Sequence, residues 1–346
     1  MFALIAFFIS WILYPIYISI LKKFKLGKTI REAAVTGEKS KIFTQLHEHK
    51  KWTPTMWGGI FLLVMGLMIG LSYLLQHFWR INNTLFNRQE TYIILFGFFS
   101  MGLIGLVDDF LNIRGHGAVK WLSAKAKLIG MVIFSAFISR WFYSRLWIDY
   151  INFRPIAGKI SLGIFYPILS FFVTIAIVNA INITDGLDGL AGGLMTMILF
   201  VLAVVLFFNQ TYIAATVVII VIGMLVAFMF YNIHPAKIFM GDSWAFALWW
   251  LIASLLYFLN MRSGIIIPFI ILFGLFIIDL TSSFLQIFRK KYLKKKLFLV
   301  APLHHLFEKR GINETTIVMK AWFIQGLLAA ITIILLFYQV NKTFVN

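Results

Sequence analysis

The sequence predicts an all-α integral membrane protein with ten transmembrane helices in a single domain, residues 1–346. Hydrophobic residues make up 61% of the chain and charged residues 13%, and the mean hydropathy is +0.90. A soluble chain of this length is far less apolar. A transmembrane helix needs roughly 20 mostly apolar residues. Ten such runs lie near residues 2–21, 54–76, 91–107, 126–143, 163–181, 190–208, 211–231, 243–260, 265–288 and 317–338.

The basic residues predict the orientation of these helices. The loops after the first, third, fifth, seventh and ninth runs, counted together with Lys127 at the edge of the fourth run, hold 22 of the 31 lysines and arginines. Cytoplasmic loops are enriched in these residues, so both termini and the loop at 80–90 are expected outside, and residues 22–52 and 289–315 in the cytoplasm. The net charge of +18 then reflects topology and anionic lipid headgroups rather than nucleic-acid binding.

Three local features complete the predicted architecture. Thr53 is a good N-cap and Pro54 a good first helical residue, so the second span should begin there. Residues 141–160 mix aromatic residues with arginine and glycine, which indicates an interfacial hairpin between the fourth and fifth runs. The chain has no cysteine, which excludes disulfides and cysteine nucleophiles.

The most informative polar stretch is Asn179–Leu194, which reads NAINITDGLDGLAGGL between two apolar runs. Asn182, Asp185 and Asp188 are spaced three apart and share one face of a helix or turn. A carboxylate at a membrane boundary costs several kcal/mol unless it is paired. The glycines allow a ligand to approach the backbone. This stretch therefore predicts a site for a cation or a polar ligand.

Further acids fall on the same predicted side of the membrane. Asp108 and Asp109 end the third span, where adjacent carboxylates repel each other unless a cation shares them. Asp242 follows a glycine at the start of the eighth span, where helix capping is an alternative role. Asp279 lies within the ninth span, as a functional acid or as the partner of a neighbouring helix.

Basic groups are expected beside these acids. His304 and His305 follow a proline in the last cytoplasmic loop and suit phosphate binding or acid–base chemistry. Zinc is a weaker alternative because the histidines lack the usual ligand spacing. Lys50 and Lys51 precede a predicted helix N-terminus, which makes an anion site or ordinary positive-inside charge. His234 is expected to make local contacts. The combination suits a phosphate-rich soluble substrate, Mg²⁺ and a lipid substrate.

Five motifs carry a resemblance to a known family: TPTM, GLVDDF, NITDGLDGLA, FMGD and PLHHLFE, in this order. The chain resembles the polyprenyl-phosphate N-acetylhexosamine-1-phosphate transferases, of the glycosyltransferase 4 type, over nearly its whole length. The resemblance implies a bacterial cytoplasmic-membrane enzyme that moves a phospho-sugar from UDP to undecaprenyl phosphate, with Mg²⁺ as cofactor and UMP as product. The resemblance is compatible with a homodimer and does not fix the oligomeric state.

The motifs are most similar to the branch that uses UDP-linked N-acetylmuramoyl-pentapeptide in peptidoglycan synthesis. The alternative is the branch that uses UDP-GlcNAc, because His304 and His305 are followed by leucine, as they are in that branch. A cation-coupled transporter is a more distant alternative. Transporters of that kind usually place such acids at the midplane between inverted repeats, and no repeat of the acidic motifs is present.

The resemblance also implies roles for individual residues. Asp108, Asp109, Asp242, His304 and His305 would be catalytic, and one acid of the Asp108–Asp109 pair would deprotonate the lipid phosphate. Asp242 and Asp185 would be metal ligands. The implied substrate-binding residues are Lys50, Lys51, Thr55, Lys125, Lys127, Asn182, Asp185, Asp188, Phe239 and Gln286.

Overall fold

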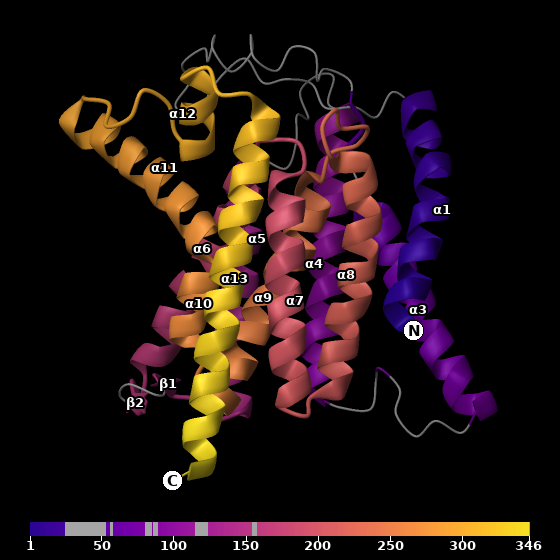
Figure 1. The fold of residues 1–346 in the computed structure, drawn as a ribbon, viewed down its shortest axis with the longest axis vertical. Coiled ribbons are helices and arrows are strands. Elements are labelled where there is room, and N and C mark those ends of the chain that lie inside the picture. The colour runs from indigo at the N-terminus through magenta and orange to yellow at the C-terminus, as the bar shows by residue number, and fades with distance from the viewer. Residues whose placement is uncertain are drawn as a thin grey trace.

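The computed structural model describes residues 1–24, 53–55, 58–79, 85, 89–114, 124–153 and 158–345, and the statements below concern these residues. They form a bundle of long helices with one small hairpin (Figure 1). The elements are α1 Phe2–Lys23, α3 Gly58–Trp79, α4 Gln89–Arg114, α5 Ala124–Arg145, β1 Tyr150–Asn152, β2 Lys159–Ser161, α6 Phe165–Thr184, α7 Leu190–Phe208, α8 Tyr212–Asn232, α9 Gly241–Ser263, α10 Ile266–Leu272, α11 Gly274–Leu293, α12 Leu303–Lys309 and α13 Glu314–Val345.

The helices confirm a multi-pass membrane architecture. Within the described residues, eight helices are long and apolar enough to cross a membrane, and α10 with α11 would make a ninth. Helix α5 covers the fourth predicted span, but its described part is not apolar enough to be counted. The tenth span therefore stays a prediction. Figure 1 shows both chain termini towards the end of the bundle that carries the hairpin, with α12 at the opposite end.

The predicted ninth span is not one straight helix. The run 265–288 is divided at Phe273 into α10 and α11, and the axes of the two helices differ by 73°. Apolar residues continue on both sides of the break, so hydropathy alone did not reveal it. Figure 1 shows α11 leaning away from the bundle, with α12 beside it.

The predicted hairpin at 141–160 is confirmed in part: residues 141–145 still belong to α5, and the second strand ends one residue later than predicted, at Ser161. Strands β1 and β2 pair antiparallel, with Ile151 opposite Ile160. Asn260 of α9 fixes the hairpin, because its side-chain oxygen accepts the Asn152 N–H at 2.9 Å and its amide donates to the Tyr150 carbonyl at 3.1 Å. The hairpin is thereby attached to the C-terminal end of α9.

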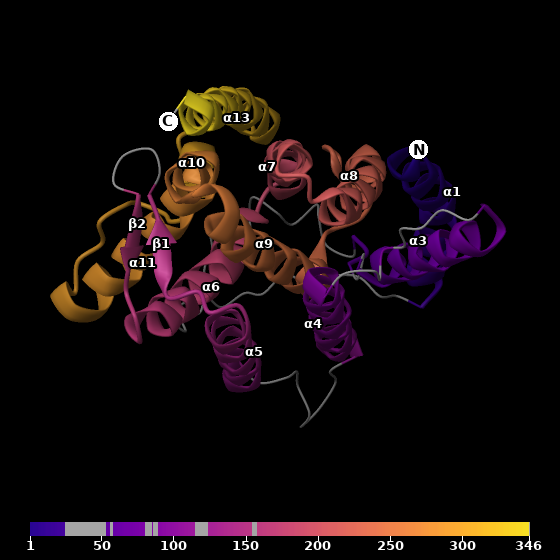
Figure 2. The same cartoon turned by 90° about the horizontal axis from the view of Figure 1, so that it is seen from below.

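Helix α9 is the central element of the bundle (Figure 2). All residues from Ser243 to Asn260 are buried. Helix α4 packs against it closely, since the Trp250 indole covers Gly97 and donates to the Ile93 carbonyl at 2.8 Å. At one end of the contact the two backbones themselves meet: a Cβ at Gly105 would overlap the Ser243 Cα and lie 2.7 Å from the Asp242 carbonyl oxygen. Small residues permit such close helix approach in membranes.

This contact predicts a large difference between two Gly→Ala changes. Gly105→Ala should destabilise the protein by about 1–3 kcal/mol, because the new methyl group meets backbone atoms that no side-chain rotation can move. The melting temperature in detergent should fall by several degrees. The control is Gly66→Ala in α3, where a Cβ meets nothing within 4 Å. Equal melting temperatures for the two variants would contradict the packing described for α4 and α9.

Candidate active site

Three carboxylates from two helices meet where α4 ends and α9 begins. Asp108 and Asp109 lie near the C-terminal end of α4, and Asp242 lies in the first turn of α9. Each of the three offers a carboxylate oxygen within 4.8 Å of the others. Asp108 and Asp109 are buried and Asp242 is half-buried. The structure thus brings together three acids that the sequence placed only on a common side.

The donor chemistry of this acid cluster fits Mg²⁺. Hard divalent cations prefer carboxylate oxygens, and Mg²⁺ is commonly held by one or two carboxylates together with substrate phosphates. Three carboxylates at such short range also repel one another unless positive charge is shared among them. The predicted metal ligand Asp242 belongs to the acid cluster, whereas neither three-ligand group among the described residues includes Asp185.

Asp109 caps helix α9 from a different helix. Its Oδ1 accepts the Asp242 N–H at 2.9 Å, and its Oδ2 accepts the Ser243 N–H at 3.0 Å. The residue before α9, Met240, supplies no side-chain cap. The alternative role of Asp242 as the N-cap is therefore wrong, because Asp242 lies inside the helix and the cap comes from α4. The first N–H groups of a helix lack intrahelical acceptors, and Asp109 satisfies two of them.

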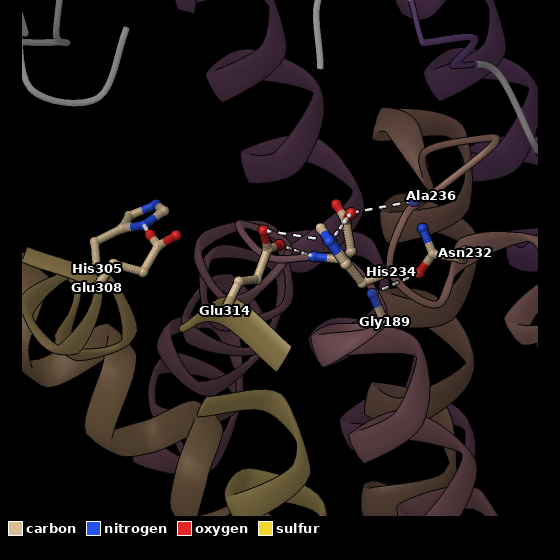
Figure 3. Close-up of polar contacts among 8 residues, drawn as sticks. Gly189, Asn232, His234, Ala236, His305, Glu308 and Glu314 are labelled. Atoms are coloured by element: carbon tan, nitrogen blue, oxygen red, sulfur yellow. Dashed lines mark hydrogen bonds and ion pairs between the residues drawn. The ribbon is translucent and has the colours of Figure 1, made fainter. Parts of the chain in front are cut away.

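A second group of ionisable residues surrounds the TDGLDG loop (Figure 3). Asp188 Oδ2 lies 3.0 Å from His234 Nδ1 and accepts the Ala236 N–H at 3.1 Å. Glu314, at the start of α13, accepts the Asp188 N–H at 2.6 Å, and its second oxygen lies 3.8 Å from His234 Nδ1. The expectation of local contacts for His234 is wrong, because its partners lie 46 and 80 residues away in sequence. The sequence reasoning missed Glu314; its one signal was its position at the start of a span on the cytoplasmic side.

Asn232 connects this group to the acid cluster. Its side-chain oxygen accepts the Gly189 N–H at 3.1 Å, and its amide donates to the Ile238 carbonyl at 2.9 Å. The loop 233–240 thus carries His234 near its start and leads into the first turn of α9, which contains Asp242. Phe239, which follows Ile238 in this loop, donates its N–H to the Pro54 carbonyl at 2.8 Å.

The Pro54 contact corrects the predicted start of the second span. Helix α3 begins at Gly58, and Thr53 and Pro54 lie before it. Because the Pro54 carbonyl pairs with the Phe239 N–H, this segment lies against the 233–240 loop instead of forming the first helical turn. Thr55 is buried there and Phe239 is half-buried. Both predicted substrate-binding residues therefore lie on segments that contact each other next to Asp242.

The two histidines of α12 lie against the TDGLDG loop. Nδ1 of His304 lies 2.7 Å from Asp279 Oδ2, and Nδ1 of His305 lies 2.6 Å from Glu308 Oε2. Their Nε2 atoms approach Gly186, where a Cβ would lie 2.5 Å from the first and 3.0 Å from the second. The predicted histidine motif and the predicted TDGLDG loop are thus in contact.

The remaining predicted residues have varied positions. Asn182 and Asp185 are half-buried at the end of α6, next to this contact. Gln286 supports the following loop, since its oxygen accepts the N–H groups of Leu297 and Phe298 at 2.9 Å and its amide donates to the Phe298 carbonyl at 2.8 Å. Lys50 and Lys51 lie outside the described residues. Lys125 and Lys127 lie in α5, at positions whose side chains are not described.

Comparison with known proteins defines the class. A family model described as glycosyl transferase family 4 matches residues 91–260, which include all three members of the acid cluster. The chain is also similar to several enzymes named phospho-N-acetylmuramoyl-pentapeptide-transferase. The identity is 35% over 343 residues for that of Clostridioides difficile, with 97% of each chain covered. It is 32% over 331 residues for that of Anoxybacillus flavithermus, with 94% of each chain covered.

The corresponding enzyme of Bacillus subtilis is 32% identical over 332 residues, with 95% of this chain and 94% of that protein covered. The chain therefore belongs to glycosyl transferase family 4 and, within it, to the phospho-N-acetylmuramoyl-pentapeptide-transferases. The resemblance carried by the five sequence motifs is confirmed, including its muramoyl branch.

The cap on α9 predicts that Asp109 stabilises the fold in addition to its proposed part in the reaction. Asp109→Asn replaces one acceptor oxygen by an N–H₂ group that faces a backbone N–H, so a buried donor loses its partner at a cost of about 1–3 kcal/mol. The melting temperature in detergent should fall. Asp242→Asn, the same chemical change on the neighbouring acid, leaves both cap bonds intact and should melt like the wild type. Asp109→Asn melting at the wild-type temperature would show that the cap contributes nothing.

Proposed function

We propose that this protein transfers phospho-N-acetylmuramoyl-pentapeptide from its UDP carrier to undecaprenyl phosphate, giving lipid I and UMP in peptidoglycan synthesis. The observation that carries the proposal is similarity over nearly the whole chain to enzymes named for this transfer, at 32–35% identity. The acid cluster of Asp108, Asp109 and Asp242 lies within the region that the family model matches.

In the proposed reaction, an oxygen of the lipid phosphate forms a bond to the sugar-side phosphorus of the UDP substrate. The bond from that phosphorus to the bridging oxygen breaks, and UMP leaves with the electron pair. Asp108 would take the proton of the lipid phosphate, and Asp109 would hold Asp242 in place through α9. The positive end of α9 favours phosphate charge at this position.

Mg²⁺ is part of this proposal, with Asp242 and its two neighbours as the residues that would hold it. When bound, the ion would offset the negative charge of the diphosphate and of departing UMP. His304 and His305 would contact phosphate oxygens from the side of the TDGLDG loop. Asp188, His234 and Glu314 would shape the nucleotide-binding side, supported by their mutual hydrogen bonds.

We also propose ten spans in the bacterial cytoplasmic membrane, with both termini outside and the acid cluster facing the cytoplasm. The support is the placement of 22 of the 31 basic residues in alternate loops. The arrangement of both termini towards one end of the bundle agrees with an even number of spans (Figure 1).

The substrate is tested by measuring UMP release from purified enzyme and undecaprenyl phosphate. UDP-N-acetylmuramoyl-pentapeptide should support turnover, and UDP-GlcNAc should not, since the relatives are named for the muramoyl substrate. Turnover with UDP-GlcNAc alone would move the protein to the other branch. UMP release without the lipid would indicate a covalent phospho-aspartyl step in place of direct attack.

The role of Asp242 is tested by Asp242→Asn. The change keeps the shape of the side chain and both cap bonds made by Asp109, but it removes the charge that a hard cation needs. Loss of metal assistance costs several kcal/mol, so turnover should fall by roughly a hundredfold or more. The measurement is Mg²⁺-dependent UMP release, with the melting temperature as the folding control. Wild-type turnover with the same Mg²⁺ titration would remove Asp242 from the proposed metal site.

A further inference from the structure

Asp279 is an acid in the apolar run that begins α11, and the function proposed above does not use it. It lies on α11, five residues after the helix begins, and its side chain is 10% exposed. Acidic side chains in a membrane span are costly unless they are paired. Its Oδ2 lies 2.7 Å from Nδ1 of His304, whose side chain is 4% exposed. The pair joins two elements, because α11 carries the acid and α12 carries the histidine.

This hydrogen bond determines which ring nitrogen of His304 faces the loop. An ionised carboxylate can only accept a hydrogen bond, so Nδ1 must carry the proton. The other nitrogen, Nε2, is buried and has no hydrogen-bond partner in the described part of the chain. It is the atom closest to the position that a Cβ of Gly186 would take, at 2.5 Å. A buried polar nitrogen without a partner costs about 1–3 kcal/mol, so this position suits a group supplied by a ligand.

The neighbouring histidine provides a comparison. His305 is also paired through Nδ1, but with Glu308 of the same short helix, three residues later. That pair is local to α12, as Figure 3 shows. The orientation of His304, in contrast, depends on α11, which the 73° bend at Phe273 turns away from the direction of α10. The bend therefore determines the position of Asp279 relative to His304.

We propose that Asp279 is a positioning residue that acts through His304. It keeps the proton on Nδ1 and turns Nε2 towards the TDGLDG loop, where Nε2–H of the doubly protonated ring donates to a phosphate oxygen of the bound nucleotide sugar. The bond to Asp279 and the bond to the phosphate then lie on opposite nitrogens of one ring. The identity of the nucleotide sugar rests on the proposed function, whereas the pairing of the two residues does not.

The first test is kinetic. Asp279→Asn should lower kcat/KM for UMP release about ten- to a hundredfold, as happens when other functional histidines lose an orienting carboxylate. His304→Ala should have an equal or larger effect. Because Asp279 acts through His304, adding Asp279→Asn to His304→Ala should cause no further loss. The matched control is Ser283→Ala, a small buried change on the same helix, which should keep wild-type turnover. Independent, multiplicative losses in the double variant would overturn the proposal.

The second test measures the wild-type protein and uses a variant only to assign the signal. In wild-type protein labelled with ¹⁵N-histidine and saturated with UMP, the His304 ring should show protons on both nitrogens. The signal is assigned among the seven histidines by its loss in His304→Ala. A ring protonated only at Nε2 would refute the pairing with Asp279. If the wild type accepts UDP-GlcNAc and rejects the muramoyl substrate, the proposed substrate fails; the kinetic test is then repeated with UDP-GlcNAc, and the test with UMP is unchanged.

Discussion

The bonds from Asp109 to the first turn of α9 connect the fold to the chemistry. Helix α9 is buried from Ser243 to Asn260, and the first N–H groups at its start have no intrahelical acceptors. Asp109 satisfies two of them with both oxygens of one carboxylate. The two hydrogen bonds that cap the N-terminus of α9 also hold Asp242 beside the acids of α4. Packing and the acid cluster are therefore not separable at this point of the structure.

The close contact of α4 and α9 fixes the distance between the carboxylates of α4 and the first turn of α9. Gly97 and Gly105 remove side chains where Trp250 and the start of α9 press against α4. A larger residue at Gly105 would move the start of α9 away from Asp109 and separate the carboxylates. Asn232 extends the same frame to the TDGLDG loop through two hydrogen bonds in opposite directions. Since Glu314 also bonds this loop, segments from α6, α8, α9 and α13 are fixed together.

Apolar runs and loop charges were enough to predict most helices, the hairpin and the common side of the polar motifs. The bend at Phe273 was not predictable from hydropathy, because apolar residues continue through it. The start of α3 was placed too early because Thr53 and Pro54 have good capping propensity, and a contact with Phe239 from a distant loop overrides that propensity. A cap on α9 was considered only for Asp242, at the start of the helix, although the residue that accepts its first N–H groups, Asp109, lies 133 residues earlier.

For the site, the sequence predicted the residue types correctly but not their partners. Four of the five acids in the two clusters were singled out, namely Asp108, Asp109, Asp188 and Asp242. Glu314 was missed because a lone acid at a helix start also suits the helix dipole. His234 was misjudged because its carboxylate partners come from other elements. Hydrogen-bond partners distant in sequence are set by the packing of helices, and no single-sequence pattern encodes them.

The central claim is that Asp108, Asp109 and Asp242 hold the divalent cation next to the diphosphate of the substrate. The most direct measurement is pulsed electron paramagnetic resonance with Mn²⁺ in place of Mg²⁺ and the UDP-linked substrate bound. The account predicts one bound Mn²⁺ per chain with hyperfine coupling to substrate ³¹P, and loss of that signal in Asp242→Asn but not in Asp188→Asn. A signal that persists in Asp242→Asn and disappears in Asp188→Asn would place the cation at the other cluster and contradict the account.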